Sequence, residues 1–126
     1  MNVWRKTNPN PCGKSVGDCA VRAVAIALGL TWREAFSLLC SKAWDMCDLP
    51  NSDAVWGAVL RSEGFKRYGI SNDCPECYTA ADFALEHPRG VYVLGFGGHV
   101  AVIRDGWLMD SWDSSGEVPI FYYKEG

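Results

Sequence analysis

The sequence predicts a single α+β domain, with helices in about the first two thirds of the chain and strands in the last third. Apolar residues recur at helical spacing up to about residue 87, and capping residues precede each run. After Gly90 the pattern changes to short β-rich runs separated by turn residues. The 126 residues, 48% of them hydrophobic and 21% charged, suit one domain with a buried core. We therefore expect one domain over residues 1–126, in which helices precede an antiparallel sheet.

Four helices are expected, each beginning at a residue whose side chain can cap a helix. Their approximate spans are residues 19–28, 32–42, 53–63 and 80–87. Asp18 is expected to cap the first helix by accepting hydrogen bonds from its first free backbone N–H groups. Thr31 and Glu34 form a capping box for the second helix, and Asn51 or Ser52 caps the third. The segments expected to be irregular are residues 1–18 and 66–78.

Four strands are expected after the helices. Their spans are residues 91–94, 99–104, 107–112 and 118–123. Asp105-Gly106 is typical of a two-residue hairpin turn, which pairs Arg104 with Trp107. Continuing this register away from the turn brings the beginning of the strand 99–104 opposite the end of the strand 107–112. The chain order therefore predicts an antiparallel sheet built mainly from the last third of the sequence.

Cys19 is a candidate nucleophile. At a helix N-terminus the partial positive charge favours the thiolate over the thiol. The backbone N–H of a residue in the first turn is also free to bind a developing oxyanion. The other interpretation of a cysteine at this position is a small buried apolar residue. Arg22 lies on roughly the same helix face, where it would either assist the thiolate or bind an acidic neighbour.

The predicted hairpin supplies the remaining groups of a candidate site. His99 begins one strand after two glycines, and the register places it opposite Trp112. Cross-strand partners share a face of the sheet, so Asp110 lies diagonally from His99 on that face. A carboxylate there can orient the imidazole and stabilise its cation, while Trp112 covers the hydrogen bond from water. Cys19, His99 and Asp110 are thus candidates for nucleophile, base and orienting residue.

This order of residues resembles papain-like cysteine peptidases. In that family the third residue is commonly an asparagine followed by Ser-Trp, and this chain has Asp110-Ser111-Trp112 in the matching place. The motifs at 8–11, 17–19, 98–100 and 110–113 are similar to those of small papain-like proteins of phages and gut bacteria. The resemblance covers nearly the whole chain and depends on the order and spacing of short motifs. It implies a papain-like fold and a cysteine-dependent peptidase, amidase or isopeptidase with a peptide or protein substrate.

The chain departs from the family pattern in two ways. The family's usual oxyanion-hole side chain is a glutamine before the cysteine, and this sequence contains no glutamine. Asn10 or Asn8 could supply an amide donor together with the Cys19 N–H, although asparagines beside proline also serve in turns. The chain is also much shorter than a secreted papain-type enzyme. These departures leave a second hypothesis open: a catalytically inactive papain-like binding protein, for example a phage factor that occludes a host enzyme.

Composition disfavours several other classes of protein. A net charge of −3 and a pI of about 5.3 argue against nucleic-acid binding, and they do not favour cell-wall hydrolysis. No apolar run approaches the roughly 20 residues of a membrane helix. The first nine residues lack the apolar run of a secretory signal, so we expect a cytoplasmic protein, in a bacterial host if phage-encoded, with free thiols. Cys74 and Cys77 could be half of a zinc site or a redox pair, but an inert loop pair is favoured, and no metal or cofactor is expected.

Overall fold

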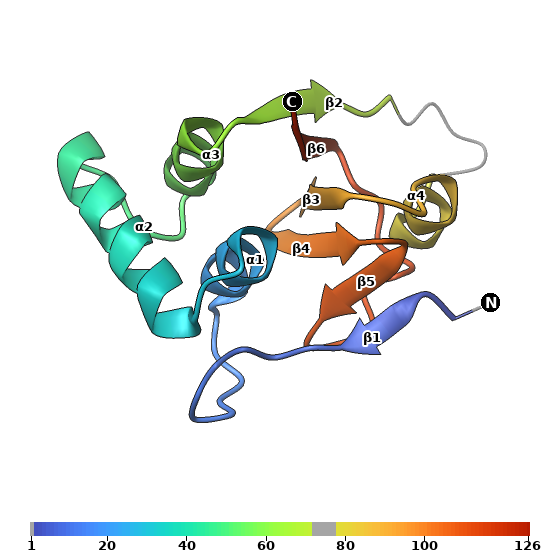
Figure 1. Cartoon of the computed structure of the whole chain (residues 1–126), viewed down its shortest axis with the longest axis horizontal. Helices are drawn as coiled ribbons and strands as arrows, with labels where there is room; N and C mark the ends of the chain where they lie inside the picture. The colour runs from blue at the N-terminus through green and yellow to red at the C-terminus, as the bar shows by residue number, and fades with distance from the viewer. Residues whose placement is uncertain (1, 72–77) are drawn as a thin grey trace.

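The computed structural model describes residues 2–71 and 78–126, and this part of the chain forms an α+β structure (Figure 1). Its helices are α1 Cys19–Leu28, α2 Trp32–Met46, α3 Asp53–Ser62 and α4 Ala80–Glu86. Its strands are β1 Trp4–Lys6, β2 Phe65–Gly69, β3 Val91–Phe96, β4 His99–Arg104, β5 Trp107–Asp110 and β6 Phe121–Glu125. The predicted α+β class is confirmed, and all four predicted helices are present.

The six strands form one mixed sheet in the order β1-β5-β4-β3-β6-β2. Every neighbouring pair is antiparallel except β1 and β5, which are parallel. The expectation of a purely antiparallel sheet was therefore wrong. The expectation that 1–18 and 66–78 are irregular was also wrong for β1 and β2. These two strands lie at the sheet edges with mostly exposed side chains, so backbone pairing forms them without an apolar pattern that the sequence could reveal.

The hairpin of β4 and β5 has the predicted register. Arg104 pairs with Trp107, and Val102 pairs with Met109. Asp105 and Gly106 have φ values of +50° and +81°, so both turn residues are in the left-handed region that a type I′ turn requires. β5 ends at Asp110 rather than at residue 112, and β6 begins at residue 121 rather than 118. The pairing that places the site is therefore the part of the sheet that the sequence specified best.

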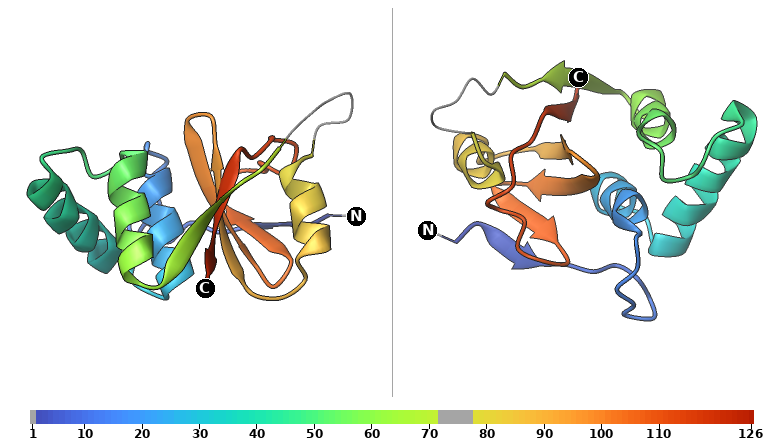
Figure 2. Two further views of the ribbon diagram at one scale, coloured as in Figure 1. Left: turned by 90° about the horizontal axis from the view of Figure 1, so that it is seen from above. Right: turned by 180° about the vertical axis from the view of Figure 1, so that it is seen from behind.

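Helices cover both faces of the sheet (Figure 2). α1, α2 and α3 lie on one face, and α4 lies on the other. Val93 and Val102 point toward α1, whereas Leu94 and Ile103 point toward α4. This double burial explains why β3 and β4 are apolar on successive residues. The expectation that all helices precede the sheet was wrong, because β1 precedes α1 and β2 separates α3 from α4.

α1 is the central helix of the larger core. Residues 20–27 are all buried, and all of them except Arg22 are apolar. It packs against β4, α2 and α3, which fixes its N-terminus beside the first residue of β4. Among the described residues no single helix is long and apolar enough to cross a membrane. The pair α1 and α2 meets the length and composition criteria only when the two helices are taken together, and they are bent by 111° relative to each other.

Gly95 in β3 provides a test of this packing. A Cβ at Gly95 would lie 2.1 Å from the ring of Phe121, and that ring is stacked on Trp56 with centroids 5.8 Å apart. We expect Gly95→Ala to lower the free energy of unfolding by about 1–3 kcal/mol, because the buried ring has little room to move. Urea denaturation followed by tryptophan fluorescence measures the loss.

Gly97→Ala is the matched control for Gly95→Ala. A Cβ at Gly97 meets no atom within 4 Å, so this variant should differ from the wild type by less than about 0.5 kcal/mol. Equal urea midpoints for the two variants would contradict the described contact between β3 and Phe121.

Candidate active site

The candidate nucleophile lies where α1 meets the sheet. Cys19 is the first residue of α1, so its backbone N–H has no carbonyl partner within the helix. Its thiol interacts with the side chain of His99, the first residue of β4, and accepts a hydrogen bond from the backbone of Val100. The structure thus brings together two residues that are eighty positions apart in the sequence.

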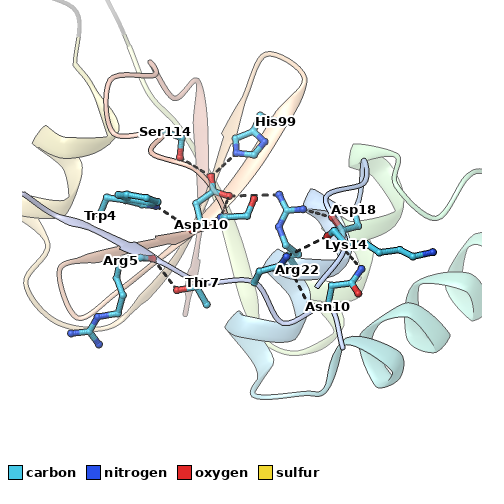
Figure 3. Close-up of polar contacts among 12 residues, drawn as sticks. Trp4, Arg5, Thr7, Asn10, Lys14, Asp18, Arg22, His99, Asp110 and Ser114 are labelled. Atoms are coloured by element: carbon cyan, nitrogen blue, oxygen red, sulfur yellow. Dashed lines mark hydrogen bonds and ion pairs between the residues drawn. The ribbon is translucent and has the colours of Figure 1, made fainter. Parts of the chain in front are cut away.

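His99 is bound on its other side by Asp110, the last residue of β5. The imidazole Nε2 lies 2.7 Å from the Asp110 Oδ2 (Figure 3). Since Nε2 is engaged with the carboxylate, Nδ1 is the ring nitrogen left for the thiol. The His99 side chain is 14% exposed and the Asp110 side chain only 2%, so solvent reaches the base but not the orienting carboxylate. The diagonal arrangement expected from the hairpin register is present.

The carboxylate of Asp110 is saturated with partners. Its Oδ2 also accepts a hydrogen bond of 2.7 Å from the fully buried Ser114 hydroxyl. Its Oδ1 accepts from the Ser111 backbone N–H at 2.8 Å and lies 3.6 Å from the Arg22 guanidinium. A buried carboxylate with donors on both oxygens has one orientation, and this orientation fixes the plane of the His99 ring.

The N-terminal strand holds the backbone of Asp110 from the other side. The Asp110 carbonyl accepts a hydrogen bond of 3.1 Å from the Trp4 indole N–H (Figure 3). It also accepts one of 2.8 Å from the Thr7 N–H. β1 pairs with β5 up to Lys6 opposite Asp110. The end of β5 is therefore anchored at the position where the carboxylate must be held.

Asp18 occupies the N-cap position of α1, but the predicted cap was wrong. Its side chain makes no hydrogen bond to the helix backbone. The carboxylate instead forms a buried ion pair with Arg22 and accepts a hydrogen bond of 2.9 Å from the Trp32 indole. The attraction of a buried guanidinium outweighs that of the free N–H groups. Arg22 thus binds acidic neighbours on two elements, Asp18 before α1 and Asp110 on β5.

Asn10, the expected amide donor to an oxyanion, is turned toward the same network. Its side-chain nitrogen lies 3.4 Å from the Asp18 Oδ2, and its oxygen accepts from the Cys12 N–H. Asn8 donates to the Lys14 carbonyl. Neither asparagine is among the residues that line the hollows beside Cys19. Of the two expected oxyanion donors, the structure leaves the Cys19 N–H at the site.

Trp112 lies beside His99, as the hairpin predicted. The two ring centroids are 4.9 Å apart. Trp112 is 45% exposed, so it covers the imidazole while one side of its indole contacts solvent. Phe96, which pairs with His99 across the β3–β4 hairpin, contributes a second ring at 5.7 Å. The His99–Asp110 hydrogen bond therefore lies next to aromatic rings, which strengthen it by limiting access of water.

These contacts shift the pKa of Cys19 and of His99 in opposite directions. Burial raises the pKa of the Cys19 thiol, but the hydrogen bonds from His99 and Val100 and the charges of His99 and Arg22 lower it below its ordinary value. Burial lowers the pKa of His99, but the hydrogen bonds and negative charges of Asp110 and Cys19 raise it to about 9. Both shifts favour a thiolate–imidazolium pair.

The pKa of Asp110 is lowered despite its burial. Burial alone raises it, but the hydrogen bonds from His99, Ser114 and Ser111 and the charge of His99 lower it below its usual range. Asp110 is therefore ionised whenever the imidazole needs a counter-charge. The buried side chain does not titrate near neutral pH, so it acts as a fixed negative charge.

Two hollows open beside the Cys19–His99 pair, and both also contain Gly17 and Gly98. The first, about 370 Å³, is walled by Asn51, Asp53 and Trp56 on the α3 side, and we call it the acidic hollow. The second, about 250 Å³, is walled by Ser15, Arg22, Ser111 and Trp112, and we call it the Trp112 hollow. Cys19 and His99 line both hollows, so the thiol can be approached from two sides.

The described residues contain no group of three or more His, Cys, Asp and Glu side chains that could hold a metal ion. Cys74 and Cys77, the alternative zinc or redox pair, lie outside the described residues. The described cysteines, Cys12, Cys19, Cys40 and Cys47, are all free thiols.

Sequence reasoning missed several residues of the site. Ser114 and Trp4 were not identified, because each acts through a loop or edge strand that has no periodic pattern. Asn51 was considered only as a helix cap, a role that Ser52 has by accepting from the Val55 N–H, and Asp53 was not identified. The only hint was the acidic and polar run between α2 and α3, which the fold places beside Cys19.

Comparison of the chain with protein-family models, with curated proteins and with solved structures gave no significant match.

The reactivity of Cys19 tests the described pair. At pH 6 an ordinary thiol with a pKa near 8.5 is well under about 1% thiolate, so it reacts slowly with iodoacetamide. We expect Cys19 to be labelled faster than the other cysteines, and His99→Ala to slow it at least about tenfold. Mass spectrometry of digested protein gives the rate at each cysteine.

His87→Ala is the control for this labelling experiment, because it removes the chain's other histidine. His87 packs against Phe83 at the end of α4, on the opposite face of the sheet. The labelling rate of Cys19 should not change in this variant. A wild-type Cys19 that is no faster than the exposed Cys12 and Cys47 would refute the thiolate–imidazolium pair.

Proposed function

We propose that this chain is a cysteine-dependent hydrolase of the papain-like type, which cleaves a peptide, amide or isopeptide bond with Cys19, His99 and Asp110. The observation that carries the proposal is the imidazole of His99, held at 2.7 Å by a buried carboxylate while it contacts a thiol at a helix N-terminus. A nucleophile, a base and an orienting group in this geometry are what covalent acyl transfer requires.

The first half of the reaction would transfer the acyl group to Cys19. The thiolate sulfur attacks the carbonyl carbon, and the C=O electron pair moves to oxygen. The Cys19 backbone N–H at the start of α1 donates to the resulting oxyanion. The His99 imidazolium then gives its proton to the leaving nitrogen as the C–N bond breaks. The amine leaves, and a thioester on Cys19 remains.

The second half would release the acyl group. Neutral His99 takes a proton from a water molecule, and the hydroxide oxygen attacks the thioester carbon. Collapse of the second tetrahedral intermediate breaks the C–S bond and frees a carboxylic acid. The thiolate and the imidazolium are then restored. Asp110 remains ionised throughout and stabilises each protonated state of His99.

The proximity of the thiol and the imidazole favours this function over an inactive binding protein. A protein that had lost catalysis would need neither the contact between Cys19 and His99 nor the access to both that the two hollows give. A reducing compartment such as the bacterial cytoplasm suits the proposed mechanism, because it keeps the nucleophilic thiol from forming a disulfide.

Loss of turnover in Cys19→Ala tests the function. We expect the wild type to cleave members of a diverse peptide library, with products read by mass spectrometry. Cys19→Ala should abolish cleavage, because no other group can form the acyl intermediate. Cys12→Ala, which removes an exposed thiol from the N-terminal loop, should cleave at the wild-type rate. Equal cleavage by Cys19→Ala and the wild type would refute the proposal.

The pH dependence of cleavage tests the role of His99. The raised pKa of about 9 means that the imidazolium proton is present below this pH and is lost above it. Because the leaving nitrogen needs that proton, kcat/KM should fall with an alkaline limb near pH 9. Alkylation of Cys19 needs only the thiolate, so its rate should not fall over the same range.

Asp110→Asn tests the effect of the carboxylate charge on His99, because asparagine has nearly the same shape as aspartate but no charge. Removing the negative charge lets the pKa of His99 fall toward its ordinary value of about 6.5, so the alkaline limb should move to lower pH. Asp113→Asn makes the same change of net charge at an exposed position and should leave the limb in place. An unchanged limb in Asp110→Asn would contradict the proposed role of the carboxylate.

A further inference from the structure

The acidic hollow contains polar and charged side chains that have no role in the proposed hydrolysis steps. It lies on the α3 side of the Cys19–His99 pair and has a volume of about 370 Å³, enough for one long side chain. Its walls include the carboxylate residue Asp53 and the amide residue Asn51. No lysine or arginine is among the described residues that line it. Cys19 and His99 also line it, and the opposite charges of a thiolate–imidazolium pair cancel, so the Asp53 carboxylate gives the hollow a net negative charge.

The carboxylate of Asp53 is fixed in place rather than free on the surface. Its Oδ1 accepts a hydrogen bond of 3.0 Å from the indole N–H of Trp56. Trp56 is 2% exposed, is stacked on Phe121 at 5.8 Å, and makes an edge contact with Tyr123 at 5.4 Å. Those two rings belong to β6, so the sheet itself holds the indole that orients the carboxylate. Asp53 is exposed, and a ligand in the hollow can reach it.

The Trp112 hollow differs in its charge. Its one arginine, Arg22, is already engaged by the carboxylates of Asp18 and Asp110. No carboxylate is among the described residues that line that hollow. His99 lines both hollows, but only the acidic hollow adds a carboxylate, Asp53, to the Cys19–His99 pair. The two sides of the thiol therefore differ in charge.

We propose that the acidic hollow binds a cationic group of the substrate, an ammonium or a guanidinium, next to the bond that Cys19 attacks. This inference rests on the proposed function, because it assigns a class of substrate to the same site. Asp53 supplies the counter-charge, and Asn51 supplies a neutral acceptor for a further N–H. A substrate with a lysine or arginine side chain, or with a free α-amino group, has the required chemistry.

Charged thiol reagents test the inference without any turnover. The rate of Cys19 modification is measured with a cationic methanethiosulfonate (trimethylammonioethyl) and an anionic one (sulfonatoethyl), each relative to 2-mercaptoethanol. The wild type should favour the cationic reagent. Asp53→Asn keeps an oxygen for the Trp56 indole but removes the charge. The cation-to-anion rate ratio should fall about threefold to tenfold, as expected for one partly solvated charge a few ångström away.

Two further variants make the result specific. Asp45→Asn changes the net charge equally at an exposed site on α2 outside the hollow, and its ratio should equal that of the wild type. Asp53→Glu retains the charge and should retain most of the ratio, which guards against a fold defect in Asp53→Asn. An unchanged ratio in Asp53→Asn, or an equal fall in Asp45→Asn, would overturn the inference.

Protection of Cys19 by small amides distinguishes the source of the cation. Nα-acetyl-lysine amide should slow iodoacetamide labelling if a side chain binds, and alanine amide should slow it if an α-amino group binds. Equal slowing by neutral Nα-acetyl-norleucine amide would show an apolar contact and would overturn the inference. Failure of the proposed function has a different signature, namely slow labelling of Cys19 by neutral iodoacetamide with no dependence on His99.

Discussion

The structure depends on the buried guanidinium of Arg22, which bridges Asp18 before α1 and Asp110 at the end of β5. All three side chains are nearly inaccessible to solvent, so each charge needs the others. Leaving one buried charge unpaired typically costs about 3–5 kcal/mol. Because Cys19 follows Asp18 directly and Asp110 binds His99, this bridge sets the distance between the helix that carries the nucleophile and the strand that carries the orienting residue.

The same bridge gives a physical reason for an aspartate where the resembled family commonly has an asparagine. A neutral amide at position 110 would leave Arg22 with Asp18 alone and would remove the counter-charge of the imidazolium. With Asp110 ionised, the buried charges alternate in sign from Asp18 through Arg22 and Asp110 to His99. Transfer of the thiol proton to the imidazole then extends this alternation to Cys19 without changing the net charge of the site.

The sequence predicted the candidate site better than the edges of the sheet. The Asp105-Gly106 turn set the register of a hairpin, and that register alone brought His99 next to Asp110, as the structure has it. Partners that act from loops or edge strands could not be predicted. The Ser114 hydroxyl reaches Asp110 through an irregular turn, and β1 is too short and too exposed to leave a pattern. The cap expected of Asp18 failed because only the fold shows that a buried arginine competes for its carboxylate.

The arrangement separates the groups that would perform the chemistry from those that would select the substrate. Cys19, His99 and Asp110 are held by α1, β4 and β5, which pack around one buried ion-pair network. Asp53 belongs to α3, and the Trp56 indole that orients it rests on rings of β6. A change of charge at position 53 therefore leaves the contacts of the imidazole intact, whereas a change at position 110 alters both the imidazole and the buried arginine. Substitution of Asp53 should therefore change the preference for charged ligands, and substitution of Asp110 should change the activation of Cys19. The two effects should be nearly independent, because the two carboxylates share no hydrogen-bond partner.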